Sequence, residues 1–249
     1  MNIKTIFDRL LYYVSVPKCV LCNTRLDFED KGICKACRCV YEMHKSRNCS
    51  RCAKQLHYCS CTNEYMKSHS IKKHLKLFKY LNTEQSQPGN HLIYSLKRDN
   101  RDDVIEFLSD ELVKVIKYNI DVSNKENYIL TGVPRRRPSI AKYGYDHIDV
   151  LARAVSKKLD IKYMKLLKSN SKKSQKQTRG IDRLTNANFD YLSKREINLK
   201  GKTAFIIDDI ITTGASIGAS AILVKGLGAK ECIAVSCASA YNDQYTKRE

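Results

Sequence analysis

The sequence predicts an α/β protein with a mostly parallel sheet flanked by helices, preceded by a cysteine-rich zinc-ribbon module. Short apolar runs without polar alternation recur along the chain, and such runs are typical of strands buried on both faces of a parallel sheet. Amphipathic helical stripes separate them, as expected for a doubly wound sheet. Nine of the eleven cysteines fall between Cys19 and Cys61, before these elements. We therefore expect an N-terminal helix and a double zinc ribbon over residues 1–70, and the α/β domain over residues 71–245.

The cysteines of the N-terminal segment form four closely spaced pairs. The eight candidate metal ligands are Cys19, Cys22, Cys34, Cys37, Cys49, Cys52, Cys59 and Cys61. Each pair can present two thiolates from one tight turn, and two turns complete a tetrahedron around Zn²⁺. We expect two structural zinc sites, one from the first four cysteines and one from the last four; a crossed arrangement is the alternative. Disulfides and a redox-active pair are competing interpretations, but four pairs in succession and a cytosolic setting favour metal.

The charge balance is strongly basic. The chain of 249 residues carries 45 Lys and Arg against 26 Asp and Glu, a formal net charge of +19. This predicts long-range attraction to polyanions such as nucleic acid, although basic residues that are merely solvated would give the same total. Arg47, Arg51 and Lys54, with Tyr58 and Tyr65 nearby, would suit contact with single-stranded nucleic acid. No apolar stretch is long enough to span a membrane and no secretory signal is recognisable, so we expect a cytoplasmic protein.

The predicted elements follow one another in the order that a doubly wound sheet requires. An apolar helical stripe over residues 3–14 is expected to dock on the protein itself, and a membrane-surface helix is the alternative. Residues 70–80 are expected to form a strand or a helix, and residues 82–90 a loop. Residues 104–116 form a helix, which Asp102 or Asp103 would begin favourably. Strands are expected over residues 128–133, 161–164, 204–207 and 232–237, and helices over 148–159 and from 215 onward.

The stretch from Lys202 to Ser216 carries the clearest chemistry. Ala204–Ile207 form the apolar run of a buried strand, and Asp208 and Asp209 follow at once, which places two carboxylates at the carboxyl edge where open α/β sheets bind ligands. Next comes a hydroxyl-rich loop that opens a helix: Thr212, Thr213, Gly214, Ala215 and Ser216. Free backbone N–H groups and the helix dipole converge there, so the loop is predicted to cradle a phosphate. A tight turn whose Asp and Thr residues only cap is the alternative.

Two further basic segments are candidates for ligand contact. The strand at 128–133 is followed by Pro134, Arg135, Arg136, Arg137 and Pro138. We expect a rigid cationic loop that shares the sheet edge with Asp208 and suits a pyrophosphate; a solvated charge run is the alternative. The long polar segment 168–183 is expected to be a functional lid or disordered. A lid would close over an anionic substrate, and a nucleic-acid-binding loop is the rival; the cations concerned are Lys172, Lys173, Lys176 and Arg179.

Two sets of motifs resemble known families. Residues 202–216 resemble the phosphoribosyl pyrophosphate (PRPP) motif of type I phosphoribosyltransferases: four hydrophobic residues, two acidic, two variable, then T-T-G and small residues. The region from Pro17 to Ala240 resembles the ComF family, competence-associated phosphoribosyltransferase-like proteins with an N-terminal double zinc ribbon. The cysteine pairs match in order, and 91–98 and 132–155 resemble the corresponding family segments. The residues that fall where the family's lid segment has the same types are Gln177, Arg183, Asn186 and Phe189.

The resemblance implies a type I phosphoribosyltransferase-like fold and a set of site residues. Asp208 and Asp209 would be catalytic and engage the ribose 2′- and 3′-hydroxyls. The 5′-phosphate would be held by Thr212, Thr213, Gly214, Ala215 and Ser216, with Lys97, Pro134, Arg135 and Arg136 as further binding residues. Related enzymes bind PRPP with Mg²⁺ and displace pyrophosphate through an oxocarbenium-like transition state. One departure is Tyr143–His147, which reads Tyr-Gly-Tyr-Asp-His where the family usually has Arg-Gly-Phe-Asn-Gln.

The resemblance also implies a cytoplasmic protein linked to DNA uptake and natural transformation, which acts on or beside incoming single-stranded DNA with proteins of the uptake machinery as partners. Three functions are open at this point. The first is a phosphoribosyltransferase with an unknown acceptor. The second is a nucleobase-salvage phosphoribosyltransferase. The third is a non-catalytic DNA-binding accessory protein that carries a relic PRPP site.

Overall fold

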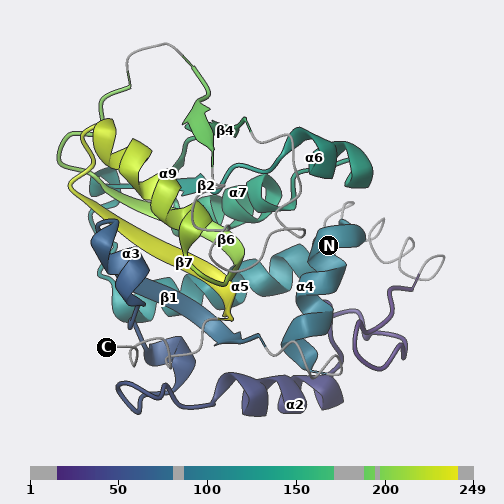
Figure 1. The fold of residues 1–249 in the computed structure, drawn as a ribbon. Helices are drawn as coiled ribbons and strands as arrows, with labels where there is room; N and C mark the ends of the chain where they lie inside the picture. The colour runs from purple at the N-terminus through teal and green to yellow at the C-terminus, as the bar shows by residue number, and fades with distance from the viewer. Residues whose placement is uncertain (1–15, 81–86, 171–187, 194–196, 241–249) are drawn as a thin grey trace.

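The computed structural model describes residues 16–80, 87–170, 188–193 and 197–240. Its centre is a five-stranded sheet in the order β1-β7-β6-β2-β3 (Figure 1). The strands are β1 (Ile71–Lys79), β2 (Tyr128–Gly132), β3 (Lys162–Tyr163), β6 (Thr203–Ile211) and β7 (Glu231–Ser239). Every neighbouring pair is parallel, so the predicted mostly parallel sheet is confirmed. A separate antiparallel pair is formed by β4 (Leu167–Ser169) and β5 (Phe189–Tyr191).

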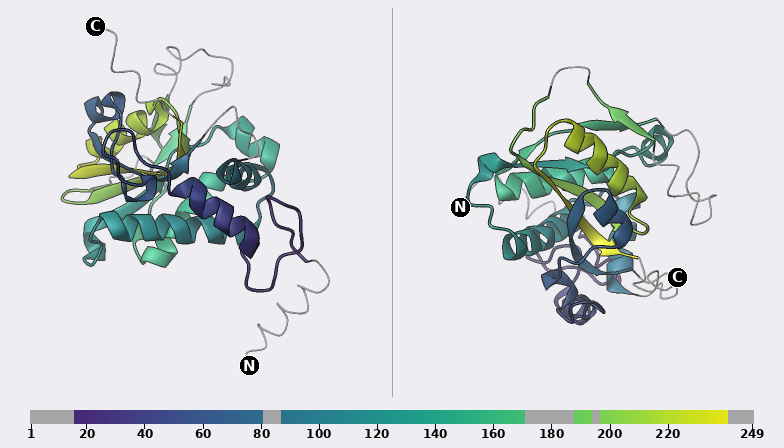
Figure 2. Two further views of the ribbon diagram at one scale, coloured as in Figure 1. Left: turned by 90° about the horizontal axis from the view of Figure 1, so that it is seen from below. Right: turned by 60° about the vertical axis from the view of Figure 1, so that its left-hand side comes forward.

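Helices cover both faces of the sheet (Figures 1 and 2). One core joins Phe205 and Ile207 of β6 to α2 (Lys35–Lys45), α4 (Pro88–Arg98), α5 (Asp102–Asn119) and α7 (His147–Leu159). A second core joins Ala204 and Ile206 to α3 (Glu64–Ser68) and α9 (Ala215–Gly226). Because successive strand residues point to opposite faces, the unbroken apolar run of β6 contributes to both cores. Shorter segments are α6 (Arg137–Tyr143) and the 3-10 turns η1 (Leu56–Tyr58) and η2 (Lys125–Asn127).

Most predicted elements are present. The strands expected over 128–133, 161–164 and 232–237 and the helices over 104–116, 148–159 and from 215 onward all appear, and residues 70–80 take the strand alternative. None of the helices in the described parts of the chain has both the length and the apolar character of a membrane span. The stripe 3–14 and seven lid residues lie outside the described residues: Lys172, Lys173, Lys176, Gln177, Arg179, Arg183 and Asn186.

Three boundaries differ from the prediction, each for a local reason. β6 continues to Ile211 because its pairing with β7 persists to that residue, so Asp208 and Asp209 lie inside the strand and not beyond it. The predicted loop 82–90 ends early, because Pro88 begins α4, a position where a helix needs no proline N–H. Gly89 permits this, since a Cβ there would fall 2.2 Å from the ring of Phe78. Residues 137 and 138 likewise belong to α6 and not to the predicted cationic loop.

The cysteine-rich segment shares its core with the sheet. Leu26, Ile33 and Tyr41 are almost completely buried in the same cluster as β1 and α5. Lys31 adds a polar contact, because its ammonium lies 2.7 Å from Glu106 of α5. The segment is therefore packed onto the α/β fold.

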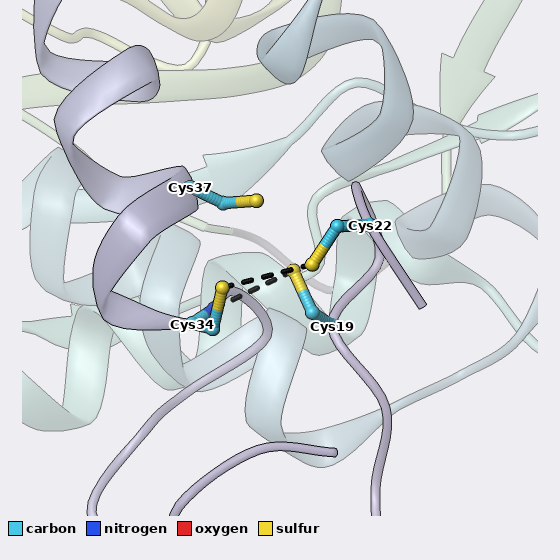
Figure 3. Close-up of side chains that lie close together, drawn as sticks. All are labelled: Cys19, Cys22, Cys34 and Cys37. Carbon is cyan, nitrogen blue, oxygen red and sulfur yellow. Dashed lines mark hydrogen bonds between the residues drawn. The ribbon is translucent and has the colours of Figure 1, made fainter. Parts of the chain in front are cut away.

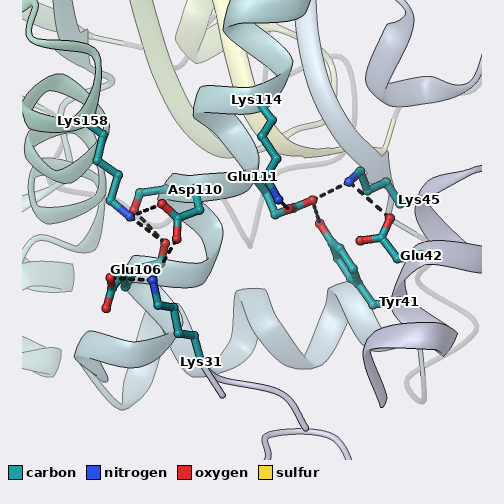
Figure 4. A network of polar contacts seen from close by, with 10 residues as sticks. Lys31, Tyr41, Glu42, Lys45, Glu106, Asp110, Glu111, Lys114 and Lys158 are labelled. Atoms are coloured by element: carbon teal, nitrogen blue, oxygen red, sulfur yellow. Dashed lines mark hydrogen bonds and ion pairs between the residues drawn. The ribbon is translucent and has the colours of Figure 1, made fainter. Parts of the chain in front are cut away.

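A buried ion pair joins α2 of the cysteine-rich segment to α5 of the α/β fold (Figure 4). Glu111 of α5 is 1% exposed, and its carboxylate lies 2.5 Å from the ammonium of Lys45 in α2. Lys114 lies 2.7 Å away on the other oxygen, and the Tyr41 hydroxyl donates to Glu111 at 3.4 Å. Because a buried carboxylate is costly unless it is paired and hydrogen-bonded, these contacts are what make Glu111 tolerable between the helices.

The substitution Glu111→Ala is expected to lower the free energy of unfolding by about 3 kcal/mol, because it leaves the buried ammonium of Lys45 without its closest partner. Urea denaturation followed by circular dichroism measures this loss. The control is Glu106→Ala, whose side chain is 51% exposed and whose ion pair is worth less than about 1 kcal/mol. Equal losses in the two variants would contradict a special role for the buried pair.

Candidate functional site

The carboxyl edge of the sheet holds an open cavity between β6 and the start of α9. Asp208, Ile210 and Ile211 line it from the strand, and residues 212–217 line the rest. We call Thr212–Ser216 the cavity loop. Gly214 is the N-cap residue of α9 and has a φ of +92°, a left-handed conformation that favours glycine. The structure thus brings Asp208 together with all five residues of the predicted phosphate loop, at a helix end that attracts anions.

Asp209 belongs to a different environment from that of its neighbour. It is 4% exposed and is not among the residues that line the cavity. Its Oδ2 atom lies 2.7 Å from Nε2 of His147, 3.1 Å from Nζ of Lys97 and 3.8 Å from Nη1 of Arg135. These bases come from α7, α4 and the segment after β2, so one carboxylate links β6 to three other parts of the fold.

The two carboxyl groups have opposite electrostatic properties. Burial and the adjacent Asp209 carboxylate raise the pKa of Asp208 to about 7. Burial also acts to raise the pKa of Asp209, but Lys97, His147 and Arg135 outweigh it and hold that pKa well below its usual value. Asp209 is therefore the permanently ionised member of the pair, and Asp208 is the member whose charge changes near neutral pH.

The other predicted binding residues lie around the same edge. Pro134 is buried, Arg135 reaches Asp209, and Arg136 occupies the N-cap position of α6. Lys97 lies in the last turn of α4, with 31% of its side chain exposed. The structure therefore brings Lys97 and Arg135 to one carboxylate, which the sequence alone did not show.

Two residues that contact the site were missed by sequence reasoning. His147 appeared only as a departure from the family pattern at 143–147, and that departure was the available signal. Asn63 had no signal at all: its Nδ2 donates to the carbonyl oxygen of Thr213 at 3.0 Å, across 150 positions of sequence.

The eight cysteines of the predicted pairs form two groups of four. Figure 3 shows the first group (Cys19, Cys22, Cys34 and Cys37), and the second group consists of Cys49, Cys52, Cys59 and Cys61; within each group the sulfur atoms lie within 4.8 Å of one another. Sγ of Cys22 and Sγ of Cys34 are 3.7 Å apart. A tetrahedral shell with Zn–S bonds of about 2.3 Å separates its sulfurs by about 3.8 Å. Both groups can therefore bind zinc, and the grouping is the sequential one.

In each group one cysteine has a neighbour that favours its thiolate, against burial, which raises the pKa of Cys37, Cys59 and Cys61. Hydrogen bonds from the Thr24 side chain and backbone lower the pKa of Cys22 to about 6. Beside the second group, the ammonium of Lys76 lies 3.6 Å from Sγ of Cys59, although Lys76 is only 2% exposed. A buried cation at this distance offsets the negative charge that four thiolates bring to a metal.

Comparison with known proteins gives one family match and several weak structural likenesses. Residues 149–249 match the family model of the phosphoribosyl transferase domain. No curated protein matches the chain. A purine phosphoribosyltransferase from Pyrococcus horikoshii is 22% identical with a TM-score of 0.34, over 53% of this chain and 71% of that one. A hypoxanthine phosphoribosyltransferase from Staphylococcus aureus is 14% identical with a TM-score of 0.36, over 53% of this chain and 61% of that one.

An adenine phosphoribosyltransferase from Leishmania tarentolae is 14% identical with a TM-score of 0.39, over 67% of this chain and 91% of that one. The family match covers β6, the cavity loop and α9, and it supports a phosphoribosyltransferase-type domain in this part of the chain.

The variants Asp208→Asn and Asp209→Asn are expected to change stability in opposite directions. Because the pKa of Asp208 is raised from 3.8 to about 7, its contribution to stability is complete below pH 3.8 and is lost as the pH rises through about 7. Asp208→Asn, neutral at every pH, should therefore melt about 3 °C above the wild type at pH 8 and close to it at pH 4. Differential scanning fluorimetry measures both temperatures.

Asp209→Asn should melt below the wild type at pH 8, since it removes the charge that pairs with Lys97, Arg135 and His147. A lowered pKa contributes stability above the usual Asp value that is lost on acidification, so this deficit should shrink as the pH falls. The same sign of change for both variants would contradict the division between the two carboxylates.

Proposed function

We propose that the protein binds PRPP or ribose 5-phosphate, together with Mg²⁺, in the cavity between β6 and α9, and that it is a phosphoribosyltransferase whose acceptor is still to be identified. The observation that carries the proposal is the cavity itself, where Asp208 and the cavity loop meet at the N-terminus of α9. A sugar phosphate suits both halves of this site, since amide groups bind phosphate and a carboxylate accepts from hydroxyls. The phosphoribosyl transferase domain match supports the same class of ligand.

Each part of the ligand meets a different element in this proposal. The 5′-phosphate accepts hydrogen bonds from backbone N–H groups of the cavity loop, at the positive end of the α9 dipole. Ionised Asp208 accepts hydrogen bonds from the ribose hydroxyls. Asp209, predicted to share that task, is better suited to hold Lys97 and Arg135 in place, because its Oδ2 atom already contacts both.

The proposed reaction is the displacement of pyrophosphate from C1 of PRPP by an acceptor nucleophile. The bond from C1 to the pyrophosphate oxygen breaks as the bond from the acceptor to C1 forms, and positive charge develops on the ribose. Lys97 and Arg135 offer fixed cations to the departing pyrophosphate, and fixed charges stabilise a transition state without reorganisation. Mg²⁺, held by the diphosphate and by oxygen ligands such as Asp208, would neutralise charge on the leaving group.

Isothermal titration with PRPP and Mg²⁺ tests the ligand. The wild type is expected to bind with measurable heat, and Asp208→Asn is expected to bind at least about tenfold more weakly, because charge-assisted hydrogen bonds to the ribose are lost. Lys225→Gln, at the opposite end of α9, is the control and should bind as the wild type does. No heat from the wild type, or equal weakening in both variants, would overturn the assignment. Turnover of a free purine or pyrimidine base in a parallel panel would identify a salvage enzyme.

We propose further that this is a ComF-type protein of the cytoplasm, linked to DNA uptake and natural transformation, with single-stranded DNA and proteins of the uptake machinery as partners. The resemblance of the cysteine pairs and the PRPP motif supports this, together with the net charge of +19. One surface suits a single strand: Tyr58 and Tyr118 are 39% and 65% exposed, and their ring centroids are 4.3 Å apart. The exposed aromatic rings offer base stacking, and Lys54, an exposed residue four positions before Tyr58 in the sequence, offers a phosphate contact. This surface also favours the third of the functions left open by the sequence, a non-catalytic DNA-binding accessory protein with a relic PRPP site.

Fluorescence anisotropy with a labelled single-stranded oligonucleotide tests the DNA surface. Binding is expected to weaken steeply as salt is added, because phosphate contacts release counterions. Tyr58→Ala and Tyr118→Ala should each weaken binding by about tenfold through lost stacking. Tyr94→Ala, which removes a ring of α4 that is 54% exposed, is the control and should have little effect. Binding that ignores salt, or an equal loss in the control, would contradict the proposed surface.

A further inference from the structure

The short helix α3 contacts the cavity loop through one side-chain hydrogen bond and through close packing. Asn63 is the N-cap residue of α3: its Oδ1 accepts from the backbone N–H of Met66 at 2.8 Å, and its Nδ2 donates to the carbonyl oxygen of Thr213 at 3.0 Å. The cap bond fixes the orientation of the amide, so the Nδ2 donor is directed at the loop. One side chain thus begins α3 and anchors the loop at the same time.

Close packing adds to this hydrogen bond. Met66 is completely buried, and a Cβ built on Gly214 would lie 2.6 Å from its Cγ atom. One turn further along α9, a Cβ on Gly218 would lie 3.2 Å from Tyr65 and from His69, whose rings are stacked with centroids 4.1 Å apart. The first turn of α9 therefore packs directly against α3.

The second cysteine group fixes the position of α3. Arg51, between Cys49 and Cys52, donates to the carbonyl oxygen of Thr62 at 2.5 Å, immediately before Asn63. Lys76 donates to the carbonyl oxygen of Cys61 at 2.8 Å, which ties the same turn to β1. A helix of five residues is too short to be stable by itself, so α3 depends on these contacts for its place.

The first cysteine group lies elsewhere. Cys19 is part of the core that contains α5 and α7, whereas Met66 of α3 is part of the core that contains α9. The backbone N–H of Gly32, two residues before Cys34, donates to Asp103 of α5 at 3.1 Å. The two groups therefore contact different parts of the fold, and only the second is connected to the cavity loop by the contacts described above.

We propose that the second cysteine group, when it holds its metal, positions the cavity loop for anion binding, and that Asn63 is the positioning residue through which it acts. The identity of the anion rests on the proposed function; the mechanical link from the metal group to the loop does not. Loss of the metal from this group would break the hydrogen bond from Arg51 to the Thr62 carbonyl, so the N-terminus of α3 would no longer be held in position. The carbonyl of Thr213 would then lose the hydrogen bond from Asn63. The loop amides then lose the arrangement in which they converge on a phosphate.

Two variants of Asn63 separate its two contacts. Asn63→Asp keeps the oxygen that caps α3 but removes the donor to Thr213, whereas Asn63→Ala removes both. Hydrogen exchange of amides 212–218 should rise by about tenfold in Asn63→Asp, with the melting temperature close to that of the wild type. Titration with PRPP and Mg²⁺ should weaken by a similar factor. Wild-type exchange and wild-type affinity in Asn63→Asp would overturn the positioning role, and Asn63→Ala shows the added effect of losing the cap.

The matched pair Cys52→Ser and Cys22→Ser tests the metal link, because each removes the exposed second cysteine of a C-x-x-C turn. Zinc content should fall from two ions to one per chain in both variants, as measured by elemental analysis. Exchange of amides 212–218 should rise only in Cys52→Ser. Equal exchange of this segment in the two variants, or a rise only in Cys22→Ser, would overturn the proposal.

The outcomes also separate this inference from the proposed function. If the wild type binds no PRPP while exchange in the cavity loop still follows the second cysteine group, the ligand assignment is wrong and the link stands. If the wild type binds PRPP and Cys52→Ser binds it equally well with unchanged loop exchange, the ligand stands and the link is wrong.

Discussion

The contacts of the Asp209 carboxylate hold the carboxyl edge of the sheet together. Isolated burial of a carboxylate would cost several kcal/mol, so the group requires partners. Lys97, Arg135 and His147 supply them from α4, from the segment after β2 and from α7. No strand pairing joins α4 to β6, and the last backbone bond from the segment after β2 to β6, from Val133 to Ile207, is made two residues before Arg135. The shared carboxylate therefore sets where the two flexible cations lie, and it holds them beside the cavity before any ligand arrives.

Strand geometry explains why two consecutive aspartates have such different tasks. Side chains alternate between the faces of a strand, so residues 204, 206 and 208 share the face of α9 while residues 205, 207 and 209 share the face of α4 and α7. Asp208 consequently lies at the cavity and Asp209 among the buried bases. The two carboxylates also repel each other, and for this reason the charge of Asp209 raises the pKa of Asp208. Such stored repulsion is common where a site is arranged for function at some cost in stability.

Much of this arrangement follows from local sequence, and the rest follows from packing. The unbroken run Ala204–Ile207 predicted a buried parallel strand, and the spacing of the cysteine pairs predicted two tetrahedral groups. Extending the alternation of side chains past Ile207 would also have predicted which face of the strand each aspartate occupies. The bond from His147 to Asp209 spans 62 positions and that from Asn63 to Thr213 spans 150. Such contacts depend on how the helices pack against the sheet, and local sequence patterns do not predict that packing.

The order of strands has a consequence for biosynthesis. Among the residues that the structure describes, β7 is the last strand in chain order, yet it lies between β1 and β6, and β1 pairs with β7 alone. The sheet therefore cannot close until translation of this region is almost complete, since β1 waits for its partner. The cysteine-rich segment, made first, would meanwhile face the ribosome exit with its thiols uncovered. Early capture of metal ions by the nascent chain would shield those sulfurs from oxidation while the remaining strands are synthesised.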